Sequence, residues 1–424
     1  MLIKTFKIKF FVLFLSLFFV SCQNQENAPG PPFSAYVLQL IPLTTSQQRS
    51  DAPTYKYDKA TFSTLQDLNN LSGTYYQMFQ GGKLTAKYVT GSIVLAKSFE
   101  QTKNVRLRYN VVNGTVSPKD YSTAAMLSAY YQYDTVINSI QTMTGYSPTY
   151  INSKYGLIKI FFEPTIVLED DGSTIQSSTK LNAAYMPGSH QFLLFQRSTL
   201  ENIPLSGNLQ VIAHETGHSI WELAFDNGNS PDCDRINQEY VIRGLNEGFA
   251  DLLSYTMTGS TNILKNSIDI NNTSGQRNFS IISFNYDLIS SGVADSSNSI
   301  CQQSFYCIGT LFANAIFKAQ LNLGHDQTTL SGRSAMMNVI TNALKTTKSN
   351  MINLPAANFS DYCKPSNGDS NNNTYNGQVL GSFFQAFLNQ IGTGTTQNQI
   401  CSQLKANFGS TGFPSSYRTG FTCP

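Results

Sequence analysis

The segment His214-Glu215-Thr216-Gly217-His218 constrains this chain more than any other feature of its sequence. Residues four apart on a helix lie on one face, so His214 and His218 can bind one metal ion together if the segment is helical. The apolar residues directly before it favour a buried helix from Val211 to Trp221. Glu215 leaves such a helix at a different angle and can reach a water on the ion. The segment therefore predicts two metal ligands and a base, with Zn²⁺ as the expected ion.

A third protein ligand is expected downstream, and Glu247 is the strongest candidate. Glu247 and Asp251 lie one helical turn apart in the segment Gly244–Asp251, hence on the same face. Glu247 can coordinate the ion, while Asp251 can accept a hydrogen bond from a ligating imidazole and fix its tautomer. An acidic first turn favoured by the helix dipole is the alternative interpretation of this pair. Poorer candidates for the third ligand are Glu222 and Glu239.

The two motifs together resemble one family of enzymes. HETGH, followed by Asn246-Glu-Gly-Phe-Ala-Asp251, resembles the gluzincin metallopeptidases, most closely the thermolysin-like and fungalysin-like branches. The resemblance covers roughly residues 118 to 320, and only the zinc motifs in it are highly specific. Residue by residue, the resemblance implies that zinc is bound by His214, His218 and Glu247. It also implies that Glu215 is the general base and that Asp251 is the carboxylate partner of an imidazole.

The resemblance also implies an activity and a place for the substrate. Asn182-Ala-Ala-Tyr185, followed by the strand Phe192–Phe195, resembles the edge strand that aligns the substrate in this family. It implies that Asn182 and the backbone of Ala183 hold the substrate. The expected activity is zinc-dependent hydrolysis of peptide bonds by a metal-activated water, as an endopeptidase in the first instance. The alternative is an inactive surface lipoprotein of the same fold that acts in binding or adhesion, and a non-peptidase zinc hydrolase ranks last.

Family members stabilise the oxyanion of the transition state with a Tyr or His further downstream. Tyr306, in the segment Tyr306–Phe312, is the candidate here, and His325 is its rival. The thermolysin type has a His one residue further ahead of its Gly, which is a departure from the pattern. Either residue can instead be purely structural.

The first residues predict export. Three lysines precede an apolar run from Phe10 to Val20, and Ser21 stands directly before Cys22. This pattern indicates a signal peptide over residues 1–21. A permanent transmembrane helix is not expected, because the apolar run is about half the ~20 residues that span a bilayer. A cysteine in this place resembles a bacterial lipoprotein signal, which implies a lipid on Cys22 and attachment to the cell envelope, at the outer membrane or cell surface. Plain secretion is the alternative.

Periodicity along the chain predicts an α+β fold: a zincin-like domain with a mostly helical C-terminal part and a small β-rich N-terminal region. The expected divisions are a flexible tether over 22–33, the β-rich region over 34–116 and the catalytic region over 117–424. Asn113-Gly114 predicts a hairpin turn, and Asn371-Asn-Asn373 a surface loop. Strands are expected at Ala35–Ile41, Ile93–Ala96, Val105–Tyr109, Leu157–Phe162 and Ala183–Gln196. Helices are expected at Tyr121–Thr144, Val211–Trp221, Leu245–Met257, Thr310–Gln320, Ser334–Lys345 and Phe383–Ile391.

Composition limits the partners. The net charge is only +2 and there is no long basic run after the first residues, so nucleic acid is not expected. The expected partners are a peptide or protein substrate and, through the lipid, a membrane. Six cysteines follow Cys22, and an even number in an exported chain favours disulfide bonds of open connectivity. They are Cys233, Cys301, Cys307, Cys363, Cys401 and Cys423.

Overall fold

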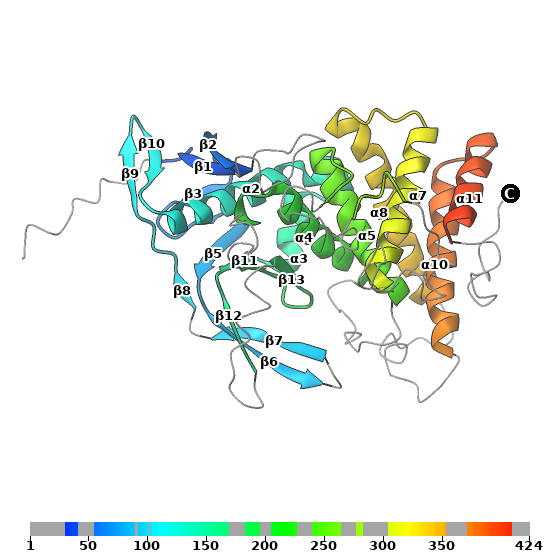
Figure 1. The fold of residues 1–424 in the computed structure, drawn as a ribbon, viewed down its shortest axis with the longest axis horizontal. Coiled ribbons are helices and arrows are strands. Elements are labelled where there is room, and N and C mark those ends of the chain that lie inside the picture. Colours follow the sequence, from blue (N-terminus) through cyan, green and yellow to red (C-terminus); the bar gives the residue numbers. More distant parts are fainter. Residues whose placement is uncertain are drawn as a thin grey trace, which may run out of the picture.

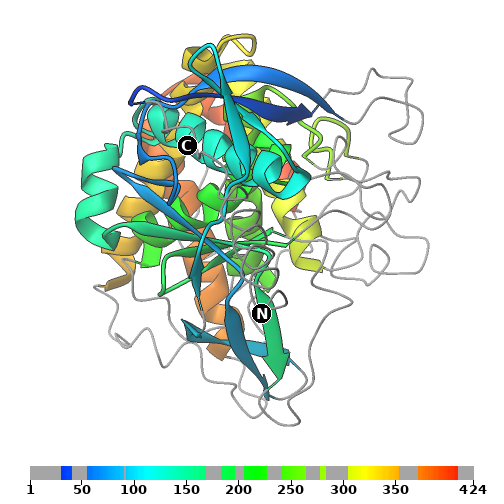
Figure 2. The same ribbon diagram turned by 90° about the vertical axis from the view of Figure 1, so that its left-hand side faces the viewer.

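The computed structural model describes residues 30–40, 55–89, 92–100, 102–168, 183–195, 205–226, 240–263, 277–282, 304–352 and 371–408. Strands occupy one end of the molecule and helices the other (Figure 1), and the strands lie in front of the helices when seen from the strand end (Figure 2). This arrangement confirms the predicted α+β class. Within the described ranges, no helix has both the length and the hydropathy needed to span a membrane.

The strands of the described residues form three sheets. The first has the order β2-β1-β10-β9, the second β13-β14-β11-β5-β4-β3 with β8 beside β5, and the third β12-β6-β7. Their bounds are β1 Ser34–Leu40, β2 Tyr55–Thr61, β3 Leu65–Asp67, β4 Ser72–Gly73, β5 Tyr76–Gln80, β6 Lys83–Val89, β7 Ser92–Glu100, β8 Lys103–Asn104, β9 Tyr109–Val112, β10 Thr115–Pro118, β11 Ile158–Phe162, β12 Thr165–Leu168, β13 Ala183–Met186 and β14 Gln191–Leu194. Because β13 ends the second sheet among the described strands, it is an edge strand in this part of the chain.

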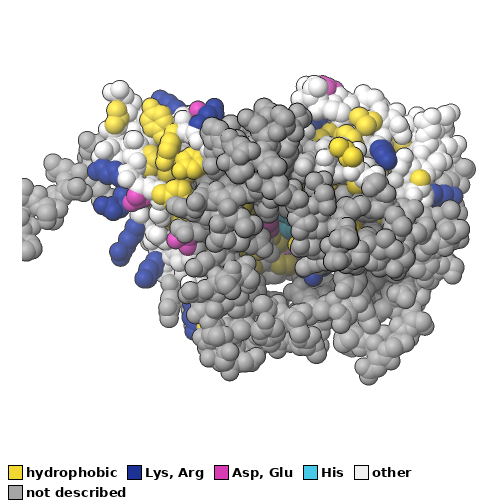
Figure 3. Space-filling view, in the orientation of Figure 1, with side chains coloured by type: hydrophobic (Ala, Val, Ile, Leu, Met, Phe, Trp, Pro, Cys, Tyr) yellow, Lys and Arg dark blue, Asp and Glu magenta, His cyan; other side chains and the backbone are white. Residues whose placement is uncertain are grey.

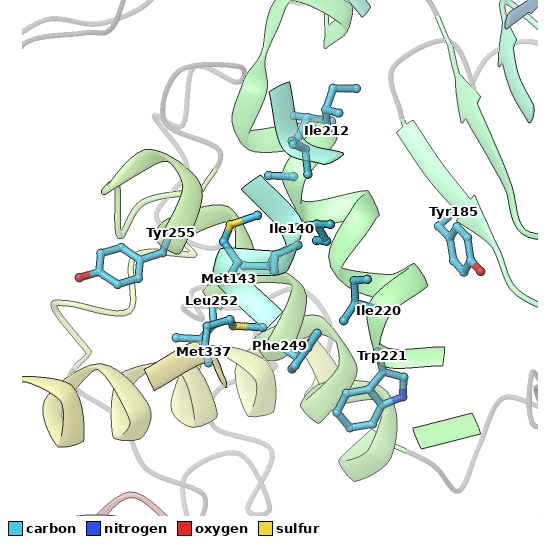
Figure 4. Packing of buried hydrophobic residues seen from close by; sticks show 14 of the residues in the cluster. Ile140, Met143, Tyr185, Ile212, Ile220, Trp221, Phe249, Leu252, Tyr255 and Met337 are labelled. Atoms are coloured by element: carbon cyan, nitrogen blue, oxygen red, sulfur yellow. The ribbon is translucent and has the colours of Figure 1, made fainter. Parts of the chain in front are cut away.

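The helices pack around α2 and α5. Their bounds are α2 Tyr121–Thr144, α3 Pro148–Tyr155, α4 Leu209–Trp221, α5 Tyr240–Thr258, α7 Ser304–Asn322, α8 Leu330–Ile352, α10 Asn371–Gln390 and α11 Thr395–Phe408. A single 3₁₀ turn precedes α4 and a π-helical turn, Glu222–Asp226, follows it. Apolar side chains of α2, α4, α5 and α8 meet in one core, shown in Figure 4 for Ile140, Ile212, Phe249 and Met337.

The helix α2 has the predicted bounds because its ends are capped. The Asp120 side chain accepts a hydrogen bond from the Thr123 amide at 2.8 Å, which satisfies one of the free donors of the first turn. Gly145 ends the helix in the left-handed conformation, with φ 74°. Between these caps α2 is buried along most of its length and lies beside β1 and α4. The ligand-bearing helix α4 therefore packs against a buried helix whose two ends are capped.

Strands from both sides of residue 116 share one sheet. Tyr76 of β5 pairs with Ile158 of β11 in a parallel register, and β11 pairs in turn with β14. The carboxylate of Asp134 on α2 also accepts hydrogen bonds from the amides and hydroxyls of Ser63 and Thr64. The β-rich region is thus built into the same core as the later helices, and its separate existence as a domain stays a prediction.

Some local expectations were wrong. The predicted strand at Val105–Tyr109 is irregular until β9 begins at its last residue, and Asn371–Asn373 opens α10 instead of forming a loop. The single strand expected at Ala183–Gln196 is instead, over residues 183–194, a hairpin of two strands, β13 and β14. The predicted turn at Asn113-Gly114 is confirmed, with positive φ at both residues between β9 and β10.

Two of the six cysteines fall in the described ranges. Cys307 of α7 and Cys401 of α11 are fully buried on adjacent helices, and both are in the disulfide-bonded state. No bond joins two cysteines of the described ranges, so the pairing of the six stays a prediction.

Candidate metal centre

Two helices bring the three predicted ligands together. His214 and His218 lie on α4 and Glu247 on α5, and their ligand atoms all lie within 4.8 Å of one another. The two imidazole Nε2 atoms are 3.1 Å apart, and Glu247 Oε2 lies 3.4 Å from the first and 4.0 Å from the second. Figure 3 shows histidine and acidic side chains in a hollow near the middle of one face. This is a buried His/His/Glu group of the kind that can hold a metal ion.

Each imidazole has a polar partner on its other nitrogen. His218 Nδ1 is 2.8 Å from Asn246 Oδ1, and an amide oxygen only accepts, so Nδ1 carries the hydrogen. His214 Nδ1 is 2.9 Å from Asp251 Oδ1, an ion-pair contact whose angles are not those of a hydrogen bond. Both contacts favour the tautomer with hydrogen on Nδ1, which leaves the Nε2 lone pairs facing one another.

This arrangement fits a small divalent cation. Four tetrahedral ligands at 2.0–2.1 Å from zinc lie about 3.3 Å from each other, close to the three separations between the ligand atoms. With both rings in this tautomer, the two Nε2 lone pairs and the carboxylate oxygen repel one another unless a cation or a proton lies between them. Two imidazoles and a carboxylate are also a ligand set that suits zinc.

The charges of the group are strongly coupled. Burial alone would lower the pKa of His214, but the Asp251 and Glu247 carboxylates outweigh it and raise that pKa to about 9. Burial opposes ionisation of Glu247, yet Arg277 and His214 hold the pKa of that carboxyl well below its usual range. In the metal-free chain, a proton on His214 therefore takes part of the place of the cation.

Three helices, α4, α5 and α7, pack closely around Glu247. A Cβ on Gly217 of α4 would lie 2.5 Å from the Cα of Ala250 on α5, so these backbones touch. A Cβ on Gly309 of α7 would lie 2.8 Å from the Gly244 carbonyl and 2.9 Å from the Gly248 amide, both on α5. The glycines let α4 and α7 approach α5 on the two sides of Glu247.

The predicted base lies against the edge strand. Glu215 Oε2 accepts a hydrogen bond from the Tyr185 amide of β13 at 2.8 Å, and Glu215 is not one of the clustered ligands. Ala183 is the first residue of that strand, whereas Asn182 lies outside the described residues. The base and the strand expected to align a substrate are therefore neighbours.

Glu222, one rival for the third ligand, has a different role. Its carboxylate accepts hydrogen bonds from the Tyr185 hydroxyl and, at 2.7 Å, from the Gly188 amide. His190 Nδ1 lies 3.3 Å from it. Glu222 thus fastens the β13–β14 hairpin to the end of α4. The other rival, Glu239, lies outside the described residues.

The two candidates for oxyanion stabilisation lie at opposite ends of α7. Tyr306 is in its first turn, close to Gly309, whose added Cβ would lie 3.1 Å from the Cβ of Glu247. His325 follows the last turn, roughly 25 Å further along at 1.5 Å per residue. Burial, followed by the charge of Glu247, raises the pKa of Tyr306 to about 12. Tyr306 is thus the candidate at the Glu247 end of α7, and its role in the oxyanion site stays a prediction.

Sequence reasoning missed Arg277 and Asn246. Arg277 Nη2 donates to Glu247 Oε2 at 2.9 Å and to Asp251 Oδ1 at 2.7 Å, and its Nε donates to Asp251 Oδ2 at 3.0 Å. Its guanidinium also lies over the Tyr306 ring, 4.6 Å from the centroid. Asn246 directly precedes Glu247, so its place in the motif was a usable signal. Arg277 lies in a separate segment with no local pattern that points to it.

Comparison with known proteins adds no relative. No model of a protein family matches the sequence, no curated protein matches it, and no solved structure matches the fold. The functional argument therefore rests on the arrangement of the site itself.

Proposed function

We propose that this protein is a zinc-dependent peptidase of the gluzincin kind. One observation carries the proposal: His214 Nε2, His218 Nε2 and Glu247 Oε2 converge, and Glu215 lies outside their group, held by the backbone of an edge strand. Ligands alone would serve a structural ion as well. A separate carboxylate on the same helix supplies what hydrolysis needs in addition, a group that can accept a proton.

Each residue of the site has its own role in the proposed reaction. A bound zinc ion would lower the pKa of a water molecule and polarise a substrate carbonyl. Glu215 keeps Oε2 on the Tyr185 amide, so we assign its Oε1 to accept the proton of the attacking water and pass it to the leaving amine. Tyr306 keeps its hydroxyl proton at neutral pH and donates a hydrogen bond to the developing oxyanion. Asp251 and Asn246 orient the imidazoles.

A peptide is the substrate class that the edge strand favours. β13 ends its sheet and has no second strand partner within the described ranges. An extended peptide can add to such an edge through main-chain hydrogen bonds, which would place its backbone beside Glu215. We assign Ala183, with Asn182 before it, to this role.

An inactive binding or adhesion protein on the same fold is the second candidate, and one observation favours it. Arg277 donates to Oε2 of Glu247, the same oxygen that faces the imidazoles. A cation already placed there would weaken the attraction of the site for a metal ion. Metal analysis separates the two candidates.

The test is zinc content by elemental analysis of the purified chain beside its Glu247→Ala variant, followed by cleavage of a peptide library. We expect one zinc per chain, its loss in the variant, and cleavage that depends on the metal. Absence of zinc from the unchanged protein after zinc has been offered would contradict the peptidase and favour the binding protein. Zinc without cleavage of any peptide would contradict the assigned reaction alone.

A further inference from the structure

One guanidinium is shared by the two carboxylates of α5. Arg277 reaches Glu247 and Asp251 through three hydrogen bonds of 2.7 to 3.0 Å. The side chains are nearly closed to solvent, with exposed fractions of 12% for Arg277, 12% for Glu247 and 1% for Asp251. Such contacts are charge-assisted and, because they are buried, only weakly screened by salt.

Without a cation beside it, this buried pair of carboxylates would lower the stability of the fold. Like charges one turn apart on a helix repel each other, and burial removes the water that would screen them. Arg277 supplies a fixed positive charge within hydrogen-bond distance of both. The Tyr306 ring covers the guanidinium and restricts where it can go.

Arg277 and the imidazoles approach the same atom. Glu247 Oε2 lies 2.9 Å from Arg277 Nη2 and 3.4 Å from His214 Nε2. A carboxylate oxygen has two lone pairs, so it can accept from the guanidinium and still bind an ion between the imidazoles. Arg277 therefore fixes the rotamer of Glu247 without blocking its second lone pair.

We propose that Arg277 is a positioning residue that assembles the ligand group before any metal binds. It holds Glu247 in the ligand position and balances the carboxylate pair, so the metal-free chain folds with its site formed. The inference rests on the proposed metal site for its purpose, but its physical content belongs to the metal-free chain. An exported protein that loads its ion after folding would need such a device.

The first test is a double-mutant cycle on the metal-free chain, with Arg277→Gln, Glu247→Gln and both together. Thermal unfolding is followed by circular dichroism in the presence of a chelator. Arg277→Gln should lower the midpoint by roughly 5 °C or more, because it leaves two buried carboxylates without their counter-ion. The same change should cost clearly less when residue 247 is already neutral. Equal losses in the two backgrounds would overturn the proposal.

The second test adds zinc. Because Arg277 holds Glu247 in the ligand position, its loss should weaken zinc binding, so zinc should raise the midpoint of Arg277→Gln less than that of the unchanged protein. Arg333→Gln is the matched control, since Arg333 is buried but donates to the carbonyls of Thr256 and Gln327. Its zinc-induced rise should equal that of the unchanged protein. A rise in Arg277→Gln as large as in this control, or larger, would contradict the proposal.

Milder variants keep the comparison decisive. Where a glutamine variant does not fold even with zinc, Arg277→Lys and Arg333→Lys replace the pair, with the same difference expected at a smaller size. If the unchanged protein binds no zinc, the proposed peptidase fails, while the cycle on the metal-free chain still decides whether Arg277 holds Glu247.

Discussion

Glu215 and Glu247 are the same amino acid in two different environments. Glu247 faces Arg277 and two imidazoles, which keep it ionised and pointed at the place of the ion. Glu215 accepts a backbone amide from the edge strand and takes no part in the ligand group. The difference in partners predicts different results when each is replaced.

Glu215→Gln should keep the zinc and lose the hydrolysis. Glutamine retains the size of the side chain but cannot take the proton of the attacking water, so kcat/KM should fall roughly 10²–10⁴-fold. Metal content and peptide cleavage measured on the same sample check this. The control is Glu247→Gln, which should lose zinc affinity as well as activity. Retained cleavage in Glu215→Gln would show that another group is the base.

Zinc affinity should rise with pH because His214 must give up a proton. Its pKa in the folded metal-free chain is about 9, so below that pH the proton competes with the ion. The apparent affinity should increase roughly tenfold per pH unit from about 6.5 to 8. Competition with a chromophoric chelator measures it.

Two further outcomes follow from the same titration. Asp251→Asn should flatten the dependence, since it removes a carboxylate that raises the pKa. The charged imidazole should also stabilise the metal-free chain fully below the unfolded pKa of 6.5, and that stability should fade as pH rises through about 9. An affinity independent of pH would contradict a protonated His214.

At the scale of elements, the centre depends on how closely α4, α5 and α7 approach one another. Gly217 meets Ala250 on one side of α5, and Gly309 meets Gly244 and Gly248 on the other. These contacts are between backbones, so no side-chain rotation can relieve them. The ligands on α4 and α5 keep their separations only while these contacts hold.

Gly309→Ala should destabilise the fold and weaken zinc binding together. The new methyl group would lie under 3.0 Å from backbone atoms of α5, and such overpacking costs about 1–3 kcal/mol. Leu321→Ala is the control, because Leu321 is at the exposed end of the same helix. Chemical denaturation and zinc titration of the two variants make the comparison. Wild-type values for Gly309→Ala would show that α7 can move away freely.

At the scale of the whole molecule, sequence patterns predicted those features of the fold that interactions between near neighbours in the chain determine. The α+β class and the bounds of α2 were predictable because caps and helical spacing lie in the sequence around Tyr121–Thr144. The proximity of His214 and His218 followed from their spacing of four. The start of α10 at Asn371 was not predictable, since an Asn-rich segment favours loops and packing along α8 overrides it. Arg277 was missed for the same kind of reason, because only the tertiary fold brings it to Glu247.

The placement of the molecule in the cell gives a prediction at this scale. We propose a lipid on Cys22, which lies outside the described residues. Cys22→Ala should move the protein from the membrane fraction to the soluble fraction, because the acyl chains would provide the anchor. Fractionation followed by immunoblotting measures this, with a conservative change in the tether, Gln23→Asn, as the control. An unchanged membrane fraction would contradict the lipid.

The parallel pairing of early strands with late ones sets the order in which this chain can fold. Ser34 of β1 lies opposite Thr115 of β10, and Tyr76 of β5 lies opposite Ile158 of β11. Neither of these pairings can form while only the first of its two strands has emerged. Pairing of segments far apart in the sequence makes folding slow, which leaves a chain unfolded for longer. A polypeptide that must thread through a translocation pore before it folds would benefit from that delay.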